Sequence, residues 1–236
     1  MSQVSDDDAD SHPRTALVTG ATRGLGRATA ARLVAMGYDV LISGREPDAI
    51  LETAKELGCG GVELDVADPA SVARLVDNLE AEGVELDVLV NNAGIYMTDG
   101  PLRIDDADLA DEMATNLYGP WLLMRAFVPW MVDRGFGRVV NVSSESGSFA
   151  DGPSLGTYGV SKAALNALTV SVAAEIPSGV DVLINAVCPG WVATEMGGPS
   201  APRTIEEGTE GIITAATLPT GGPHGQFLKD GAPIPW

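Results

Sequence analysis

Short apolar runs alternate along this chain with longer segments in which apolar positions recur at helical spacing. The apolar runs lie at residues 16–19, 40–43, 61–64, 86–90, 138–142 and 182–187. They are almost wholly apolar and do not alternate with polar residues, which is typical of strands that helices cover on both faces. The segments between them have the length of crossover helices. The pattern therefore predicts an α/β fold with a parallel, doubly wound sheet.

Helices are expected at residues 25–36, 47–57, 69–82, 106–134, 157–176 and 205–218. The fourth contains Pro120, which lacks a backbone donor and clashes with the preceding turn, so we expect a kink or break near Gly119 and Pro120. After Pro189 the chain is rich in Gly and Pro up to Arg203. This segment is predicted to be a loop over the carboxyl ends of the strands, where such sheets bind ligands.

The charge balance of the 236-residue chain is strongly acidic. It has 33 Asp and Glu residues against 14 Lys and Arg, a net charge of -19. Nucleic acids and anionic membranes are therefore not expected as partners, because their binding depends on clustered Lys and Arg. Two interpretations of the acidity stay open. One is ordinary solubility, and the other is a halophilic adaptation to a salt-rich cytoplasm, where counterions screen the self-repulsion.

The beginning of the chain differs from the rest. Residues 1–13 contain four Asp and few apolar side chains, so they are expected to form an acidic disordered tail before one folded domain at residues 14–236. No apolar stretch reaches the roughly 18 residues that cross a bilayer, and no signal-peptide pattern is present. The two cysteines form no CxxC pair, as in proteins of reducing compartments. We expect a cytoplasmic protein without a metal site.

A glycine-rich turn at residues 19–26 (TGATRGLG) follows the first predicted strand, and an amphipathic helix begins at once. Glycines let the backbone turn tightly and approach a pyrophosphate, whose charge the amides and dipole of the helix stabilise. A glycine-rich turn alone is often a plain tight turn. The strand before it and the helix after it are what favour a phosphate-binding turn here.

The spacing of these glycines resembles the short-chain dehydrogenase/reductase family. Other motifs occur in the family's order along residues 15–194: Asp65 after the third strand, Asn91-Asn92-Ala93-Gly94 after the fourth, then Asn116, Ser144, Tyr158 and Lys162, and finally Pro189-Gly190 with Thr194. The resemblance implies a single-domain Rossmann-type fold with strand order 3-2-1-4-5-6-7, flanked by helices. It also implies an oxidoreductase that transfers a hydride to or from a nicotinamide.

The resemblance, together with the residues themselves, defines a candidate site. The expected catalytic residues are Asn116, Ser144, Tyr158 and Lys162. The expected cofactor-binding residues are Gly20, Thr22, Arg23, Gly24, Leu25, Gly26, Arg45, Asp65, Val66, Asn92, Ala93, Gly94, Tyr158, Lys162, Pro189, Gly190, Val192 and Thr194. By resemblance, Asp65 meets the adenine, Lys162 holds the nicotinamide ribose hydroxyls, and Asn116 holds a water in a proton relay to Lys162.

Tyr158 and Lys162 are four residues apart on a predicted helix and therefore share one face. A phenol with a pKa near 10 is a poor base at neutral pH, but an adjacent ammonium and a positively charged nicotinamide both favour the phenolate. We therefore expect the pKa of Tyr158 to be lowered. In this arrangement Tyr158 gives a proton to the developing alkoxide during reduction and takes it back during oxidation.

Ser144 follows the strand that ends at Val142 and is placed to hydrogen-bond a substrate carbonyl oxygen. Ser143 is its rival. We prefer Ser144 because, in the family, the second serine after the strand carries this role when a glycine follows three positions later, as Gly147 does here.

The expected cofactor is NADP(H), with NAD(H) as the alternative. NAD enzymes of this fold place an Asp or Glu at the end of the second strand, whereas NADP enzymes place an Arg nearby. Here Arg45 occupies that position, and Arg23 in the glycine-rich turn supplies a second guanidinium that suits a phosphate. Glu46, one residue later, keeps NAD(H) open.

Three C-terminal stretches resemble the NADPH-dependent carbonyl reductases of the family: residues 185–192, 206–208 and 222–227, with a Trp at the end. Those enzymes act on ketones, aldehydes and quinones. This chain lacks the long insertion that many of them carry between the catalytic Ser and Tyr, which covers helices by which other members pair. A homodimer or homotetramer is therefore expected. Trp191 is read either as a pocket residue or as a structural one, and His224 as structural.

Other functions stay open. Within the family they are a 3-oxoacyl-thioester reductase, for which a basic patch toward an acidic acyl carrier would be expected, and a sugar-alcohol dehydrogenase. The sequence offers little of such a patch. Outside the enzymes, a protein that senses the NADPH/NADP ratio without turnover is the alternative, since a fold does not guarantee catalysis. The Tyr158 and Lys162 pair favours an enzyme.

Overall fold

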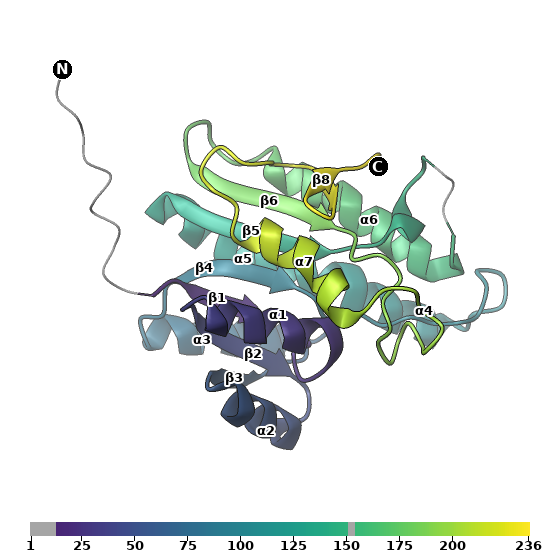
Figure 1. Ribbon diagram of the computed structural model, residues 1–236, viewed down its shortest axis with the longest axis horizontal. Coiled ribbons are helices and arrows are strands. Elements are labelled where there is room, and N and C mark those ends of the chain that lie inside the picture. The colour runs from purple at the N-terminus through teal and green to yellow at the C-terminus, as the bar shows by residue number, and fades with distance from the viewer. Residues whose placement is uncertain (1–12, 151–153) are drawn as a thin grey trace.

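The computed structural model describes residues 13–150 and 154–236 (Figure 1). The expected tail at residues 1–13 therefore lies outside the described residues, except for Pro13. The strands are β1 (Thr15–Val18), β2 (Asp39–Gly44), β3 (Gly60–Glu63), β4 (Leu86–Asn91), β5 (Phe136–Val142), β6 (Asp181–Val187), β7 (Phe227–Lys229) and β8 (Ala232–Pro233). The helices are α1 (Gly24–Ala35), α2 (Pro47–Leu57), α3 (Pro69–Ala81), α4 (Asp106–Met113), α5 (Gly119–Arg134), α6 (Gly156–Ala173) and α7 (Ile205–Ala216).

One sheet contains all of these strands in the order β3-β2-β1-β4-β5-β6-β7-β8. Neighbouring strands pair in parallel from β3 to β7, and β8 returns antiparallel to β7. The predicted order 3-2-1-4-5-6-7 and the doubly wound α/β fold are confirmed. The sequence provided no position for the seventh strand, which is β7, and the short β8 was not predicted.

Helices cover both faces of the sheet. α1, α2 and α7 pack on one face, and α3, α5 and α6 lie behind the sheet in Figure 1. Successive side chains of a strand point to opposite faces, so Ala16 and Val18 of β1 join one hydrophobic cluster while Leu17 joins the other. Because both clusters are buried, β1, β4 and β6 carry apolar side chains on both of their faces.

The helix ends follow from local sequence. Asp68 caps α3 by accepting a hydrogen bond from the amide of Ala70 at 2.9 Å. Thr204 and Glu207 form a reciprocal capping box at the start of α7, with distances of 3.2 and 2.8 Å. Gly58 ends α2 in the left-handed conformation that glycine adopts without strain.

The disturbance expected at Pro120 takes the form of a single π-helical turn. This turn, Ala114–Tyr118, lies between α4 and α5, and the amide of Gly119 donates to the carbonyl of Ala114 five residues earlier. The α-helical partner for the carbonyl of Asn116 would be the amide of residue 120, which proline lacks. The helix accommodates the missing donor by a wider turn, and Asn116 lies inside that turn.

No helix in the described ranges combines the length and the apolar character needed to cross a membrane. The parallel strands carry their carboxyl ends toward the side of the molecule where α4 lies (Figure 1). Sheets of this kind bind ligands at that edge, and the segments that follow β1, β4, β5 and β6 meet there. Those segments contain most of the candidate site residues.

Candidate active site

The turn between β1 and α1 is built around glycines that no other residue could replace. Gly20 and Gly24 have φ of +60° and +56°, a conformation that side chains with a Cβ rarely adopt. A Cβ on Gly20 would lie 2.9 Å from the Cα of Ala93, and one on Gly26 would lie 2.6 Å from the carbonyl oxygen of Gly20. The turn therefore packs directly against the segment that follows β4.

Asn92 and Thr19 tie these two segments together. The side-chain amide of Asn92 donates to the carbonyl oxygens of Thr19 and Gly20 at 2.8 and 3.1 Å. The Thr19 hydroxyl accepts from the main-chain amides of Asn92 and Ala93, both at 3.0 Å. The side chain of Asn92 is thus occupied in shaping the glycine-rich turn.

The N-terminus of α1 fits the pyrophosphate of a dinucleotide. Its N-cap, Arg23, makes no side-chain cap, and its first turn holds no acidic residue. The amides of a first turn lack helical partners and carry the positive end of the helix dipole. The side chain of Thr194 lies across this end, 3.6 Å from where a Cβ on Gly24 would be. The glycine cradle and the uncapped helix are what a bound phosphate group requires.

The remaining residues expected on the adenosine side follow β1, β2 and β3. Thr22 faces Gly44 at the end of β2, since a Cβ on that glycine would lie 3.1 Å from its methyl group. Arg45 is exposed. Asp65 turns its carboxylate back onto the amide of Ala67 at 3.0 Å, and Val66 is buried against Gly119.

The side chains of Arg23 and Leu25 point in different directions from the turn. Leu25 packs inward, toward the hydrophobic cluster beneath α1 and toward Gly208 of α7. Arg23 points into solvent and forms an ion pair with Glu195 at 2.5 Å, with both side chains about three-quarters exposed. Arg23 is thus held by the loop that follows β6.

The side chain of Arg203 anchors the loop that follows β6, and we call this set of contacts the clamp. Its guanidinium binds both carboxylate oxygens of Asp230 at 3.0 and 2.6 Å and the carbonyl oxygen of Glu207 at 2.9 Å. Gly190, with φ of +76°, lies directly on it, and a Cβ there would be 2.6 Å from its Cδ. The carboxylate of Asp230 raises the pKa of Arg203 further. The clamp was not foreseen from the sequence.

The clamp positions the segment from Pro189 to Thr194. Val192 pairs with Arg203 in an isolated β-bridge and is buried against Gly208. Beyond it, Thr194 reaches the start of α1. Pro189, Gly190, Val192 and Thr194 therefore lie between the end of β6 and the glycine-rich turn.

Tyr158 and Lys162 lie side by side on α6. The Lys162 ammonium nitrogen is 5.5 Å from the centre of the Tyr158 ring and donates to the carbonyl oxygen of Val142 at 2.9 Å. Gly94 approaches this ammonium, since a Cβ on it would lie 3.6 Å from Nζ. The end of β5, the segment after β4 and α6 thus meet at Lys162.

The pKa values of this pair depart from their ordinary values. Burial raises the pKa of Tyr158 to about 12, and the nearby Cys188 and Glu112 add to the rise, while a hydrogen bond from Ser144 opposes it. Burial lowers the pKa of Lys162 to about 8, against the opposing effect of Glu112. The expectation that Lys162 lowers the pKa of Tyr158 was wrong for the chain by itself, because burial raises this pKa and the opposing effect comes from the Ser144 hydrogen bond.

Ser144 lies beside Tyr158 in the turn after β5. Its hydroxyl accepts from the amide of Ser146 at 3.1 Å and favours the phenolate of Tyr158. Ser143 is turned the other way, since it donates to the side chain of Asn166 on α6 at 2.6 Å. Of the two serines, Ser144 is the one that lies beside the Tyr158 hydroxyl.

Gly147 explains how the serine turn reaches α6. A Cβ on this glycine would lie 2.5 Å from the amide nitrogen of Ala163 and 2.6 Å from the main chain of Lys162. Any larger residue would push the turn away from the helix. The glycine three residues after Ser144 therefore sets the contact between Ser144 and the Tyr158 helix.

Asn116 uses its side chain within the protein. Its Oδ1 accepts from the amide of Ile95 at 2.9 Å, and its Nδ2 donates to the Ile95 carbonyl at 2.8 Å and to the Ser161 hydroxyl at 3.0 Å. Both amide donors are occupied. That Asn116 holds a water in a proton relay to Lys162 stays a prediction.

A second unforeseen group lies on the other side of Ser144. The thiol of Cys188 accepts hydrogen bonds from the amides of Glu145 and Gly190, both at 3.3 Å. The Glu145 carboxylate holds the ammonium of Lys229 at 2.8 and 2.9 Å. Burial raises the pKa of Cys188, so the thiol stays protonated and joins the serine turn to the end of β6.

Glu112 on α4 was also missed. Its side chain is fully buried and its charge acts on both Tyr158 and Lys162. The signal was present, because Glu112 lies four residues before Asn116 and therefore on the same face of its helix. Nothing in the sequence showed that this face is buried.

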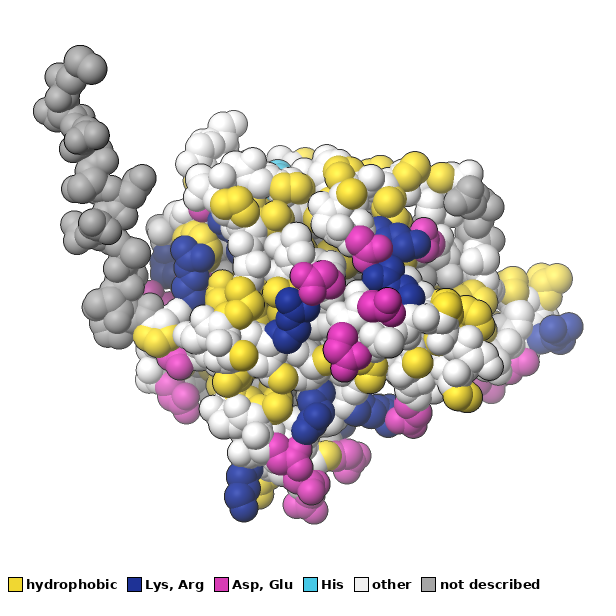
Figure 2. All heavy atoms as spheres, viewed as in Figure 1, with side chains coloured by type: hydrophobic (Ala, Val, Ile, Leu, Met, Phe, Trp, Pro, Cys, Tyr) yellow, Lys and Arg dark blue, Asp and Glu magenta, His cyan; other side chains and the backbone are white. Residues whose placement is uncertain are grey.

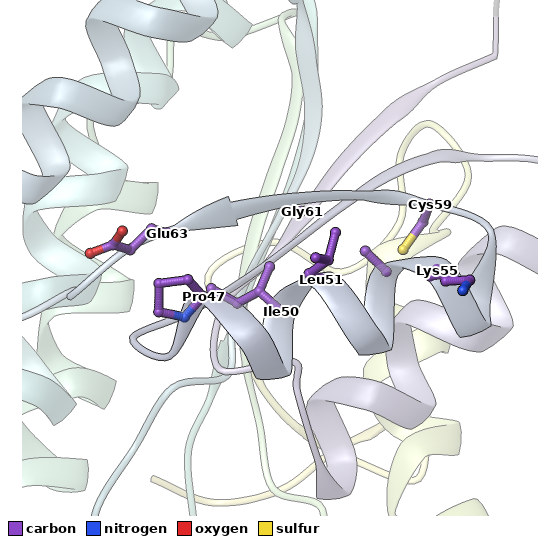
Figure 3. Close-up of a pocket in the computed structure, with 8 residues that line it drawn as sticks. Pro47, Ile50, Leu51, Lys55, Cys59, Gly61 and Glu63 are labelled. Carbon is purple, nitrogen blue, oxygen red and sulfur yellow. The ribbon is translucent and has the colours of Figure 1, made fainter.

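A cavity of about 410 Å³ lies elsewhere, between α2 and the edge strand β3. Its lining includes Pro47, Ile50 and Leu51 from the helix and Cys59, Gly61 and Glu63 from the strand side (Figure 3). It contains no candidate site residue, and β3 is separated from β5 by three strands. We place the chemistry at Tyr158, not in this cavity.

Comparisons with known proteins show the family of the chain. The model of the short chain dehydrogenase family matches residues 14–204. The chain is 34% identical to "Oxidoreductase UcpA" of Escherichia coli (strain K12), with 85% of this chain and 78% of that protein covered. It is 35% identical to "3-oxoacyl-[acyl-carrier-protein] reductase FabG" of Salmonella typhimurium, with 78% and 75% covered.

Carbonyl reductases are also similar. "Carbonyl reductase [NADPH] 1" of Sus scrofa is 33% identical, with 96% of this chain and 95% of that protein covered. The crystal structure of an NADPH-bound carbonyl reductase from chicken fatty liver superposes with a TM-score of 0.85 at 29% identity, covering 95% of this chain and all of that one. Fold, family model and relatives coincide over the residues that form the turn, the Ser144 segment and the Tyr158 helix, so the chain belongs to the short-chain dehydrogenase family.

Proposed function

We propose that this protein is an NADP(H)-dependent oxidoreductase that reduces the carbonyl of a ketone, aldehyde or quinone, with Tyr158 as the general acid. The observation that carries the proposal is the meeting of Ser144, Tyr158 and Lys162 at the carboxyl edge of the sheet, beside a helix N-terminus shaped for a phosphate. The reverse reaction, alcohol oxidation, uses the same groups.

The residues divide the chemistry between them. A bound nicotinamide supplies or accepts the hydride. Tyr158, whose pKa is about 12, keeps its proton at neutral pH and donates it to the developing alkoxide. Ser144 lies next to the phenol and is placed to stabilise charge on the same oxygen. Lys162 supplies a positive charge behind the phenol while it is protonated.

The preference for NADP(H) rests on two guanidinium groups. Arg23 at the start of α1 and Arg45 after β2 are both exposed beside the glycine-rich turn, and planar guanidinium groups suit a phosphate. Two of the similar proteins are carbonyl reductases whose names include NADPH. Glu46, adjacent to Arg45, would serve a ribose in the NAD(H) alternative.

The decisive experiment follows the absorbance of reduced nicotinamide with NADPH and then NADH against aldehydes, ketones and quinones in molar KCl. Turnover should prefer NADPH, and Tyr158→Phe should lower kcat by about 100-fold or more while cofactor affinity is kept. Tyr38→Phe, which removes a hydroxyl far from Ser144, is the control. Tight NADPH binding without turnover on the whole panel would favour a sensor of the NADPH/NADP ratio.

A second candidate is the reduction of a 3-oxoacyl thioester, since FabG is among the similar proteins. The net charge of -19 opposes it, because an acyl carrier that is itself acidic would be repelled. A 3-oxoacyl thioester and a sugar alcohol in the same panel separate these family functions. Faster turnover on the thioester than on any quinone or ketone would replace the carbonyl reductase proposal.

We further propose a cytoplasmic protein that acts on small molecules, without nucleic-acid or membrane partners, as a homodimer or homotetramer. The pairing of subunits rests on the expected lack, between Ser144 and Tyr158, of an insertion that would cover pairing helices.

A further inference from the structure

Glu112 is a buried carboxylate for which the reaction described above has no use. Its side chain is 0% exposed. One oxygen, Oε1, accepts a hydrogen bond from the amide of Met97 at 2.9 Å, and the other, Oε2, has no hydrogen-bond partner among the described residues. A buried carboxylate destabilises the fold unless a nearby positive charge compensates it.

Lys162 is the cation that can compensate Glu112. Glu112 forms no ion pair with any described residue, yet its charge acts on Lys162 and favours the ammonium. Lys162 is itself buried, and the hydrogen bond that it donates goes to a neutral carbonyl, that of Val142 at 2.9 Å. Two opposite charges are thus buried on neighbouring helices, and neither forms an ion pair with another side chain in residues 13–150 and 154–236.

The helices that carry the two charges are joined directly. The side-chain amide of Asn116, one turn after Glu112, donates to the Ser161 hydroxyl on α6 at 3.0 Å. Ser161 is the neighbour of Lys162 in the chain. The spacing between Glu112 and Lys162 is therefore held by a buried hydrogen bond and not by surface side chains.

Glu112 also holds the segment after β4. Asn116 binds both main-chain polar groups of Ile95 at 2.9 and 2.8 Å, and Glu112 binds the amide of Met97. Tyr96 lies between these two anchors, and its ring meets the ring of Tyr158 edge to face with centres 5.4 Å apart. Removing either anchor would loosen the wall of the site against which Tyr158 rests.

We propose that Glu112 is a positioning residue for the catalytic pair: its carboxylate is the counter-charge that keeps Lys162 an ammonium, and its hydrogen bond to Met97 holds Tyr96 against Tyr158. Only the kinetic part of this proposal rests on the proposed function. The ionisable groups that act on the pair are Glu112 from α4 and Cys188 from the end of β6. Of the two residues of the pair, Cys188 acts on the pKa of Tyr158 and not on that of Lys162.

The charge of Lys162 can be measured without substrate or cofactor, because the chain contains only three lysines: Lys55, Lys162 and Lys229. Labelling with lysine carrying carbon-13 at Cε gives three NMR signals, which Lys55→Arg and Lys229→Arg assign. The Lys162 signal should titrate near pH 8 in the parent chain. In Glu112→Gln, which keeps an acceptor for Met97 but removes the charge, the titration should move down by about one pH unit.

Two further variants separate charge from fold. Glu112→Asp keeps the charge and should hold the Lys162 titration near its parent value even where the bond to Met97 is weakened. Asp111→Asn removes the same charge from the exposed side of α4 and should leave Lys162 unchanged. An identical Lys162 titration in the parent chain, Glu112→Gln and Glu112→Asp would mean that Glu112 carries no compensating charge, and the proposal would be overturned.

The kinetic arm uses carbonyl reduction with NADPH. Lys162 supplies the positive charge behind the phenol only while it is protonated, so kcat/KM should fall as pH rises through the pKa of Lys162, about 8. Glu112 favours the ammonium, so Glu112→Gln should move this alkaline limb to lower pH, and Glu112→Asp should restore it. A purely structural role would lower kcat at every pH and leave the limb in place. Absence of turnover in the parent chain would count against the proposed function alone, because the lysine titration would still decide the role of Glu112.

Discussion

At the scale of single residues, Arg23 has two competing partners under the proposed function. It forms an ion pair with Glu195 in the chain by itself, and it is also the guanidinium expected to meet the 2′-phosphate of NADPH. An ion pair as exposed as this one contributes roughly 0–1 kcal/mol. Glu195→Gln should therefore strengthen NADPH binding by about two- to five-fold and leave NADH binding unchanged, as measured by fluorescence titration of the reduced nicotinamides.

A control separates this local competition from a change in overall charge. Glu206 is exposed at the start of α7 and forms no ion pair with the described residues. Glu206→Gln removes the same charge and should alter NADPH affinity less. Equal gains from the two variants, or an equal gain for NADH, would show that Glu195 does not hold Arg23 away from the cofactor.

Individual residues also show which features of the site could be predicted from the sequence alone. The order of Ser144, Tyr158 and Lys162 was sufficient to place them together, because the motif lies on one strand end and one helix face. Ser144 was preferred to Ser143 on the family's pattern, and the structure adds that the Ser143 hydroxyl is bonded to Asn166. The direction of the Tyr158 pKa was missed, since desolvation depends on how deeply the pair is buried.

At the scale of secondary-structure elements, local signals were readable and long-range pairings were not. The end of α2 follows from Gly58 and the disturbance before α5 follows from Pro120. The strands β7 and β8 are only three and two residues long, too short for a periodic pattern. β7 forms against β6, whose Ala186 and Val187 pair with Phe227 and Leu228, and β8 forms against β7.

Helices α5 and α6 carry exposed apolar side chains that suit the proposed pairing of subunits. Trp121 is 40% exposed on α5, and Val160 and Val170 are 52% and 41% exposed on α6. Apolar side chains at an interface between two copies would lose contact with water. Trp121→Asp should therefore convert a dimer or tetramer into smaller species, as measured by light scattering after size-exclusion chromatography.

The matched control is Leu51→Asp, which places the same carboxylate on an exposed apolar position of α2 at the far edge of the sheet. It should leave the molecular mass unchanged. A monomeric parent chain, or an unchanged mass in Trp121→Asp, would contradict pairing through α5. Circular dichroism of both variants ensures that dissociation is not confused with unfolding.

At the scale of the whole molecule, topology was the most predictable property. Nearly continuous apolar strands separated by crossover-length helices restrict the sheet to a doubly wound arrangement. The glycine-rich turn after β1 marks the edge at which ligands bind. The clamp of Arg203 on Asp230 could not be foreseen, because it joins residues 27 apart through the course of a loop.

The acidic surface leads to a prediction about stability in salt. On the face that Figure 2 shows, basic side chains lie beside acidic ones. Ion pairs occupy most of the basic side chains in the described part of the chain: Arg23, Arg27, Arg32, Arg74, Arg134, Arg138, Arg203 and Lys229. With 33 acidic residues against 14 basic ones, many carboxylates are left to repel one another.

Salt screens such repulsion over distances beyond about 10 Å at 0.1 M and beyond about 3 Å at 1 M. The free energy of unfolding should therefore rise between dilute buffer and molar KCl, and a gain of about 2 kcal/mol would raise Tm by roughly 4–8 °C for a chain of this size. Sucrose at equal osmolarity stabilises by exclusion and not by screening, so its effect on Tm should be smaller. Calorimetric scans in increasing KCl and in increasing sucrose distinguish the two interpretations of the acidic surface. A Tm that stays level in KCl, or that rises equally in sucrose, would leave ordinary solubility as the reason for the acidic composition.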